Sequence, residues 1–149
     1  RAVGEAYRAL SELVRDLHVL SMASSVSDSE WDTHARIHRR KSREAIETAR
    51  TAVMNTLKAR GAASNRAAQA VIRLETADQI FGALIAFSDV LEHGSDTDRM
   101  AAARMLRRMR PVLLLLGRVI VSDDPDAHRR IDRALDGIAA DQARLAPNS

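Results

Sequence analysis

At 149 residues the chain is long enough for one compact domain, and its net charge of +3 is a small basic excess in which arginine supplies 21 of the 23 basic residues. Because 46% of the residues are hydrophobic and only 3% are aromatic, the composition favours packed helices over a β-sandwich or barrel. The lack of cysteine excludes disulfides and thiolate metal sites, and the longest apolar runs reach only about a third of the ~20 residues of a membrane span.

Apolar periodicity and capping signals predict five helices, of which the first runs from about Val3 to Met22. Its buried stripe is expected to contain Ala6, Ala9 or Leu10, Leu13, Leu17 and Leu20. The serine-rich run SMASSVSDSE then forms a connection. The opening residues RAVGEAYRALSELVRDL have the pattern of a helix already in progress, so we expect residues 1–149 to be a single soluble domain taken from a longer protein.

The second and third predicted helices are both long. The second begins between Glu30 and Thr33 and continues to Arg60, after which Gly61 ends it. Its inward residues are predicted to be Ile46, Ala49, Val53 and Leu57. Ser64 or Asn65 caps the third helix, which continues to about His93 and presents Leu74, Ala77, Phe81, Leu84, Ile85, Val90 and Leu91. A short connection between two such helices predicts an antiparallel hairpin.

Two more helices are predicted after Gly94. Ser95 and Asp98 resemble a capping box that opens the fourth helix, and Pro111 is expected to kink that helix or break it in two. Asp124 and Pro125 begin the fifth, with Ile131, Leu135, Ile138 and Ala139 facing inward. The predicted fold class is therefore all-α: an elongated antiparallel bundle of about five helices around a long central helical hairpin.

Charge alternates in blocks along the chain. Residues 34–60 carry eight basic and two acidic side chains, whereas residues 74–98 carry six acidic and no basic ones. The basic block contains Arg36, Arg39, Arg40, Arg43 and Arg50. We expect Glu75 and Asp78 to pair with Arg43 or Arg50 and to set the register of the hairpin, rather than to act as a catalytic acid and base.

Two other chemical interpretations of the basic block remain open. His34 and His38 are spaced for a zinc site with Glu30 or Asp32, but the neighbouring arginines oppose a cation, and the pattern favours a solvated helix end. The arginines suit anionic lipid headgroups, while the lack of interleaved aromatic residues disfavours nucleic acid. No nucleophile with an evident base is visible, so the sequence indicates no enzyme, no cofactor and no metal.

The segments RRKSREAIETARTAVMNTLKARG and Leu74-Glu75-x-Ala77-Asp78-x-x-Phe81-x-Ala83-Leu84-Ile85-Ala86, together with the opening AYRALSELV, carry a family resemblance. They are similar to the soluble helical region of the fusaric acid resistance, or aromatic acid exporter, family of inner-membrane proteins. The resemblance covers about half of the chain and consists of packing motifs rather than catalytic signatures.

The resemblance implies a role in transport. Members of this family have two transmembrane bundles separated by a helical cytoplasmic region, and several export aromatic or other weak carboxylic acids. By that resemblance the chain is the region on the cytoplasmic side of the bacterial inner membrane, with the membrane bundles of the same parent chain, and further copies of itself, as partners. The alternatives are a free-standing helical domain that binds a ligand or a regulatory partner, and a basic accessory protein for nucleic acid.

Overall fold

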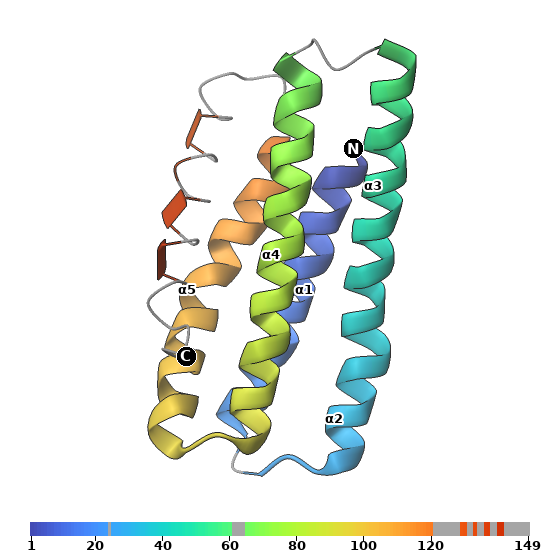
Figure 1. Cartoon of the computed structure of the whole chain (residues 1–149). Helices are drawn as coiled ribbons and strands as arrows, with labels where there is room; N and C mark the ends of the chain where they lie inside the picture. Colours follow the sequence, from blue (N-terminus) through green and yellow to red (C-terminus); the bar gives the residue numbers. More distant parts are fainter. Residues whose placement is uncertain are drawn as a thin grey trace, which may run out of the picture.

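The computed structural model describes residues 1–23, 25–60 and 65–120, and also residues 129–130, 133, 136–137 and 140–141. Four long rods stand side by side (Figure 1): α1 (Ala2–Met22); the unbroken run of α2 (Asp28–His34), the π-helical segment η1 (Ala35–Arg39) and α3 (Arg40–Arg60); α4 (Asn65–His93); and α5 (Asp96–Ile120). We call the run from Asp28 to Arg60 the second rod. The predicted all-α bundle is confirmed, with four rods in the described ranges rather than five.

The rods alternate in direction along the chain, as in an up-and-down bundle (Figure 1). The predicted long hairpin is present, because the second rod and α4 are antiparallel neighbours that contact each other. The centre of the bundle, however, is α1, which contacts the second rod and α4 and shares its most extensive interface with α5.

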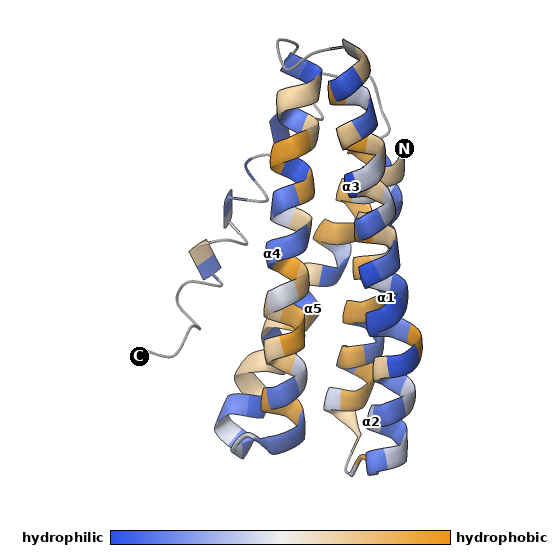
Figure 2. Ribbon diagram, turned by 45° about the vertical axis from the view of Figure 1, so that its right-hand side comes forward, coloured by the Kyte–Doolittle hydropathy of each residue, from blue (hydrophilic) through white to orange (hydrophobic). Residues whose placement is uncertain are grey.

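The central place of α1 follows from its composition. Apolar side chains occupy a wide arc of this helix rather than one narrow stripe, so several neighbours can cover it. The buried ones are Val3, Ala6, Tyr7, Ala9, Leu10, Leu13, Val14 and Leu17. Figure 2 shows the hydrophobic faces of the rods turned toward one another. Each large apolar side chain buried in this way contributes about 1.5 to 3 kcal/mol.

A pair of glycines brings α1 and α5 close together. Gly4 and Gly117 are both buried, and a Cβ atom placed on Gly117 would lie 3.5 Å from the carbonyl oxygen of Gly4 and 3.6 Å from the backbone nitrogen of Arg8. At this separation there is room for a Cβ atom on Gly117 but not for a large side chain. The first turn of α1 and the last turns of α5 therefore lie against each other.

Serine caps begin two of the helices. The Ser27 hydroxyl accepts a hydrogen bond of 3.2 Å from the backbone nitrogen of Glu30, so the second rod begins a little earlier than predicted. The Ser95 hydroxyl accepts one of 3.2 Å from the backbone nitrogen of Asp98, which confirms the predicted start of α5.

The hairpin residues predicted to face inward mostly do so. Ile46, Ala49, Val53, Leu74, Ala77, Phe81, Leu84 and Leu91 are buried. Three others, Leu57, Ile85 and Val90, are only partly buried at the edge of the core. The 3.6-residue periodicity thus located the packed face of both helices.

Of the two outcomes predicted at Pro111, the break is wrong, because α5 continues as one helix from Asp96 to Ile120. The kink stays a prediction. Pro111 is exposed, as is Arg107, whose carbonyl loses its helical partner at the proline. Water can satisfy that carbonyl on the outer face, while Leu106, Met109 and Leu113 stay buried on the inner face.

Some predictions fall outside the described residues. They concern Gly61, Ser64, and the start and inward face of the fifth helix: Asp124, Pro125, Ile131, Leu135, Ile138 and Ala139. The described residues between 129 and 141 are helical, and Asp141 lies 3.7 Å from Arg108 of α5. Within the described ranges, no helix combines the length and the apolar character needed to cross a bilayer.

Candidate functional site

The most distinctive local feature is the π-helical segment η1 in the middle of the second rod. The backbone nitrogen of Arg40 donates to the carbonyl of Ala35, five residues earlier, so this turn is wider than an α-helical turn. Single π-turns inside α-helices are frequent at functional sites. His34 and His38 lie at this turn, and four arginines lie at or just after it.

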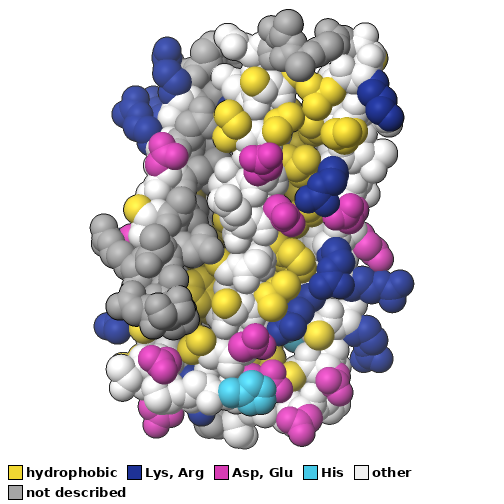
Figure 3. Space-filling view, viewed as in Figure 1, with side chains coloured by type: hydrophobic (Ala, Val, Ile, Leu, Met, Phe, Trp, Pro, Cys, Tyr) yellow, Lys and Arg dark blue, Asp and Glu magenta, His cyan; other side chains and the backbone are white. Residues whose placement is uncertain are grey.

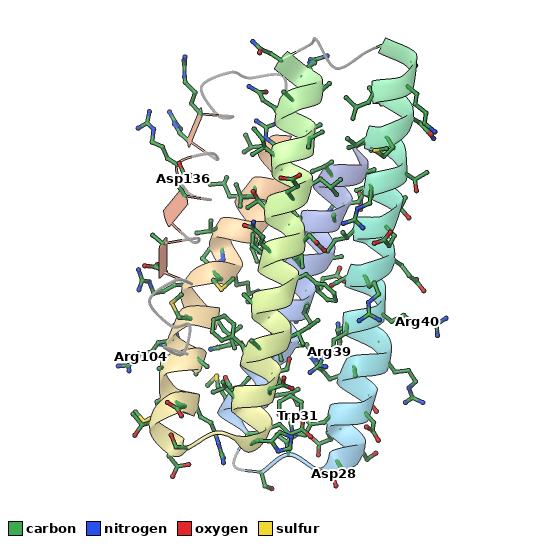
Figure 4. All side chains as sticks on the ribbon, viewed as in Figure 1. Asp28, Trp31, Arg39, Arg40, Arg104 and Asp136 are labelled. Atoms are coloured by element: carbon green, nitrogen blue, oxygen red, sulfur yellow. The ribbon has the colours of Figure 1, made fainter. Side chains whose placement is uncertain are left out.

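On the inner side of the turn, the second rod meets α1 through a histidine and a carboxylate. His34 is only 2% exposed, and its Nδ1 is hydrogen-bonded to Oδ2 of Asp16. The Trp31 ring packs edge-on against the imidazole, with 5.9 Å between centroids. Figure 4 shows Trp31 between the second rod and α4 at this end of the bundle. The predicted solvated helix end is therefore wrong for His34.

The surroundings of His34 favour its neutral form. Burial lowers the pKa of His34 below its ordinary value, and this outweighs the opposing effect of the hydrogen bond and charge of Asp16. Nδ1 is the donor in this arrangement, and Nε2 is buried without a hydrogen-bond partner among the described residues. Protonation would add an N–H at Nε2 that no described acceptor satisfies.

Polar contacts continue along the seam between α1 and the second rod. The second carboxylate oxygen of Asp16 lies 3.5 Å from Nε2 of His38. One turn on, the Lys41 ammonium lies 2.7 Å from the carboxylate of Glu12, and the Ser42 hydroxyl donates to the carbonyl of Ala9. These contacts fix the second rod against α1.

This cluster does not have the ligand set of the hypothetical zinc site. Glu30 accepts from the Ser27 hydroxyl, and Asp32 is exposed. In the described part of the chain, no group of three or more histidine, cysteine, aspartate or glutamate side chains is placed to hold a metal ion. What the geometry supports is an interhelical hydrogen-bonded cluster.

On the outer side of the same turn lies an open groove of about 940 Å³, which we call the arginine groove. Its lining residues are Ser29, Asp32, Thr33, Ala35, Arg36, Arg39, Arg40, Arg43 and Glu44. Four guanidinium groups face only two carboxylates here, so the groove is electropositive. Figure 3 shows basic side chains gathered over this part of the second rod.

The four arginines of the groove differ in what holds them. Nε of Arg40 donates to Glu44 at 3.1 Å, and the Arg43 guanidinium lies over the Phe81 ring, 5.8 Å from its centroid. Among the described residues, Arg36 and Arg39 have no carboxylate partner. Nε of Arg39 is in addition buried without a hydrogen-bond partner within these ranges.

The residues expected to set the register of the hairpin are only partly brought together. Arg50 lies against Glu47 on its own helix and 3.6 Å from Asp78 of α4. Arg43 contacts the Phe81 ring instead of a carboxylate, and Glu75 is exposed with no ion pair to any described residue. Of the ion pairs predicted between the second rod and α4, only Arg50 with Asp78 is therefore present among the described residues.

Sequence reasoning missed the acidic partners on α1. Glu12 and Asp16 are four residues apart, so they lie on one side of this helix, between the apolar residues that cover its core face. This i, i+4 spacing of acids beside a buried stripe was the available signal. The alternation of charge blocks along the chain instead indicated the acids of the third predicted helix as partners of the basic block.

Comparison of the chain with protein-family models, with curated proteins and with solved structures found no match.

Proposed function

We propose that this chain is a helical domain of an inner-membrane exporter similar to the fusaric acid resistance family. In this proposal it lies on the cytoplasmic side of the bacterial inner membrane and catalyses no reaction. It supports the efflux of aromatic or other organic acids by coupling, stabilising or oligomerising the membrane bundles of its parent chain.

The proposal is supported by one observation: the residues of α4 that carry the family resemblance pack this helix against the rest of the bundle. Leu74, Ala77, Phe81 and Leu84 form the buried face of α4, and Asp78 lies at the edge of that face against Arg50 of the second rod. The motif therefore encodes the packing of a long hairpin within a helical bundle. A packing motif of this kind suits a domain that transmits or supports movement rather than one that binds a reacting group.

The rigidity of the bundle is also in keeping with a coupling role. Buried side chains from all four rods belong to one continuous core. Polar contacts from Asp16 and Glu12 tie the second rod to α1. Because packed interiors resist deformation, a displacement applied to one rod is passed to the others.

The test begins with the location of the protein that contains this chain. The chromosomal gene is given an epitope tag, and cell extracts are separated into membranes and supernatant before and after an alkaline wash. The 149-residue chain expressed alone, with the same tag, is the matched control. The proposal predicts that the chromosomal product stays with inner membranes through the wash, while the control is released.

Recovery of the chromosomal product in the supernatant would refute the exporter assignment. That result would favour the alternative of a free-standing helical domain, for which the arginine groove supplies a binding surface.

A further inference from the structure

We propose that the arginine groove is a binding site for a small oxyanion, either a carboxylate or a phosphate. The proposal stands on the geometry of the groove and does not depend on the exporter assignment.

Four cations line one hollow surface of the second rod. Arg36, Arg39, Arg40 and Arg43 all line the groove, and of its two carboxylates only Glu44 is paired with one of them. Figure 4 shows Arg39 on the side of the second rod that faces α4 and Arg40 on the opposite side. The positive potential of a groove lined by four arginines and two acids attracts an anion.

Arg39 has a buried donor that lacks an acceptor among the described residues. Its Nε is shielded from solvent and makes no hydrogen bond to any described residue. A buried donor without an acceptor is costly, and an oxyanion in the groove would supply that acceptor. The planar guanidinium fork matches the geometry of both carboxylate and phosphate oxygens.

Part of the site is already positioned before an anion binds. Arg43 is held over the Phe81 ring, so this side chain loses little freedom when an anion binds. Arg36, which is exposed and has no ion pair to any described residue, is the side chain that would close on the ligand.

The composition of the lining indicates what is recognised. Its non-arginine residues are small or polar, such as Ser29, Thr33 and Ala35, and none of them is aromatic. A wall of this kind binds the charged end of a molecule and leaves its apolar body outside. The ligand class is therefore defined by its oxyanion.

The test is a nuclear magnetic resonance titration of the 149-residue chain that follows the arginine Nε–H signals. The two probes are sodium para-hydroxybenzoate and inorganic phosphate, at an ionic strength held constant with sodium chloride. We expect a saturable shift of the Arg39 Nε–H signal with at least one probe. Saturation by the benzoate alone identifies a carboxylate site, and saturation by phosphate alone identifies a phosphate site.

Matched variants assign the binding to the groove. Arg39→Gln should raise the dissociation constant by about tenfold or more, because a charge-assisted hydrogen bond is lost. Arg36→Gln, at an exposed position, provides a second variant if the first fails to fold. Arg104→Gln on α5 is the control, because Arg104 is also without an ion pair to any described residue but lies outside the groove.

Three results would overturn the proposal. The first is a chemical shift that grows linearly with both probes and does not saturate. The second is an equal affinity in the wild type and in both groove variants. The third is a loss of affinity in Arg104→Gln as large as the loss in the groove variants. Binding of duplex DNA or of phosphatidylglycerol vesicles with no response to either small probe would also overturn it, in favour of a macromolecular or membrane partner.

Discussion

Asp16 of α1 accepts a hydrogen bond from Nδ1 of His34, a side chain that is almost completely buried at the π-turn of the second rod. This contact joins residues 18 positions apart and lies directly beneath the turn that carries the arginine groove. The inner and outer faces of one irregular turn thus have different chemistry: a buried histidine hydrogen-bonded to a carboxylate inside, and a group of arginines outside.

The first prediction concerns pH. The pKa of His34 is lowered in the folded chain, so the unfolded chain binds more protons once the pH falls below about 6.5, the ordinary histidine value. Stability should therefore decrease as the pH is lowered through that value. Urea unfolding at a series of pH values measures this slope, and His34→Gln should make it shallower.

The control for this experiment is His93→Gln, since the His93 side chain is 74% exposed at the end of α4. Its slope should equal that of the wild type. Identical slopes for wild type and His34→Gln would show that the buried imidazole does not govern the acid sensitivity.

The second prediction concerns the core at the hairpin. Leu84 is 0% exposed, so Leu84→Ala should lower the free energy of unfolding by about 2 to 5 kcal/mol, through lost transfer energy and a residual cavity. Leu115→Ala makes the same chemical change at a position that is 57% exposed, and it should change stability by no more than about 0.5 kcal/mol. Urea unfolding measures both variants. If Leu84→Ala and Leu115→Ala lowered the free energy of unfolding equally, the assigned inward face of α4 would be contradicted.

The third prediction concerns the cross-helix ion pair. The side chains of Arg50 and Asp78 are 41% and 56% exposed, so solvent screens their attraction. A double-mutant cycle with Arg50→Ala and Asp78→Ala should give a coupling of about 1 kcal/mol or less. A coupling well above 2 kcal/mol would mean that this pair, rather than apolar packing, sets the register of the hairpin.

The fourth prediction concerns the close approach of α1 and α5. A Cβ atom on Gly117 meets its neighbours at ordinary van der Waals distance, so Gly117→Ala should be tolerated and should gain up to about 1 kcal/mol of helix propensity. Gly117→Leu should cost about 1 to 3 kcal/mol, because the larger side chain forces the helices apart. Thermal melting of the two variants distinguishes these effects, and a stable Gly117→Leu would contradict the tight contact.

The sequence was sufficient to predict the rods because their apolar residues repeat at helical spacing. Ser95 was recognisable as a cap, and Leu74, Ala77 and Leu84 were recognisable as core residues. Such features depend on residues within one or two turns of each other, which a single sequence displays directly.

The features that could not be predicted depend on distant contacts or on small changes in backbone geometry. Nothing in the composition of ARIHR distinguishes a π-turn from an α-turn. His34 is buried where it is hydrogen-bonded to Asp16 and packed against Trp31. Helix periodicity alone does not indicate which helices become neighbours. Pro111 predicts a kink or a break in α5; the break does not occur, because the exposed position of the proline allows the helix to continue.

The exporter assignment is tested most directly by the cellular retention of an aromatic acid. Cells that lack the gene encoding this chain are loaded with radiolabelled para-hydroxybenzoate, and the label retained over time is compared with that in the complemented strain. The account predicts slower loss of label from the deleted strain and recovery on complementation. Equal loss of label from both strains, repeated with fusaric acid and benzoate, would contradict it.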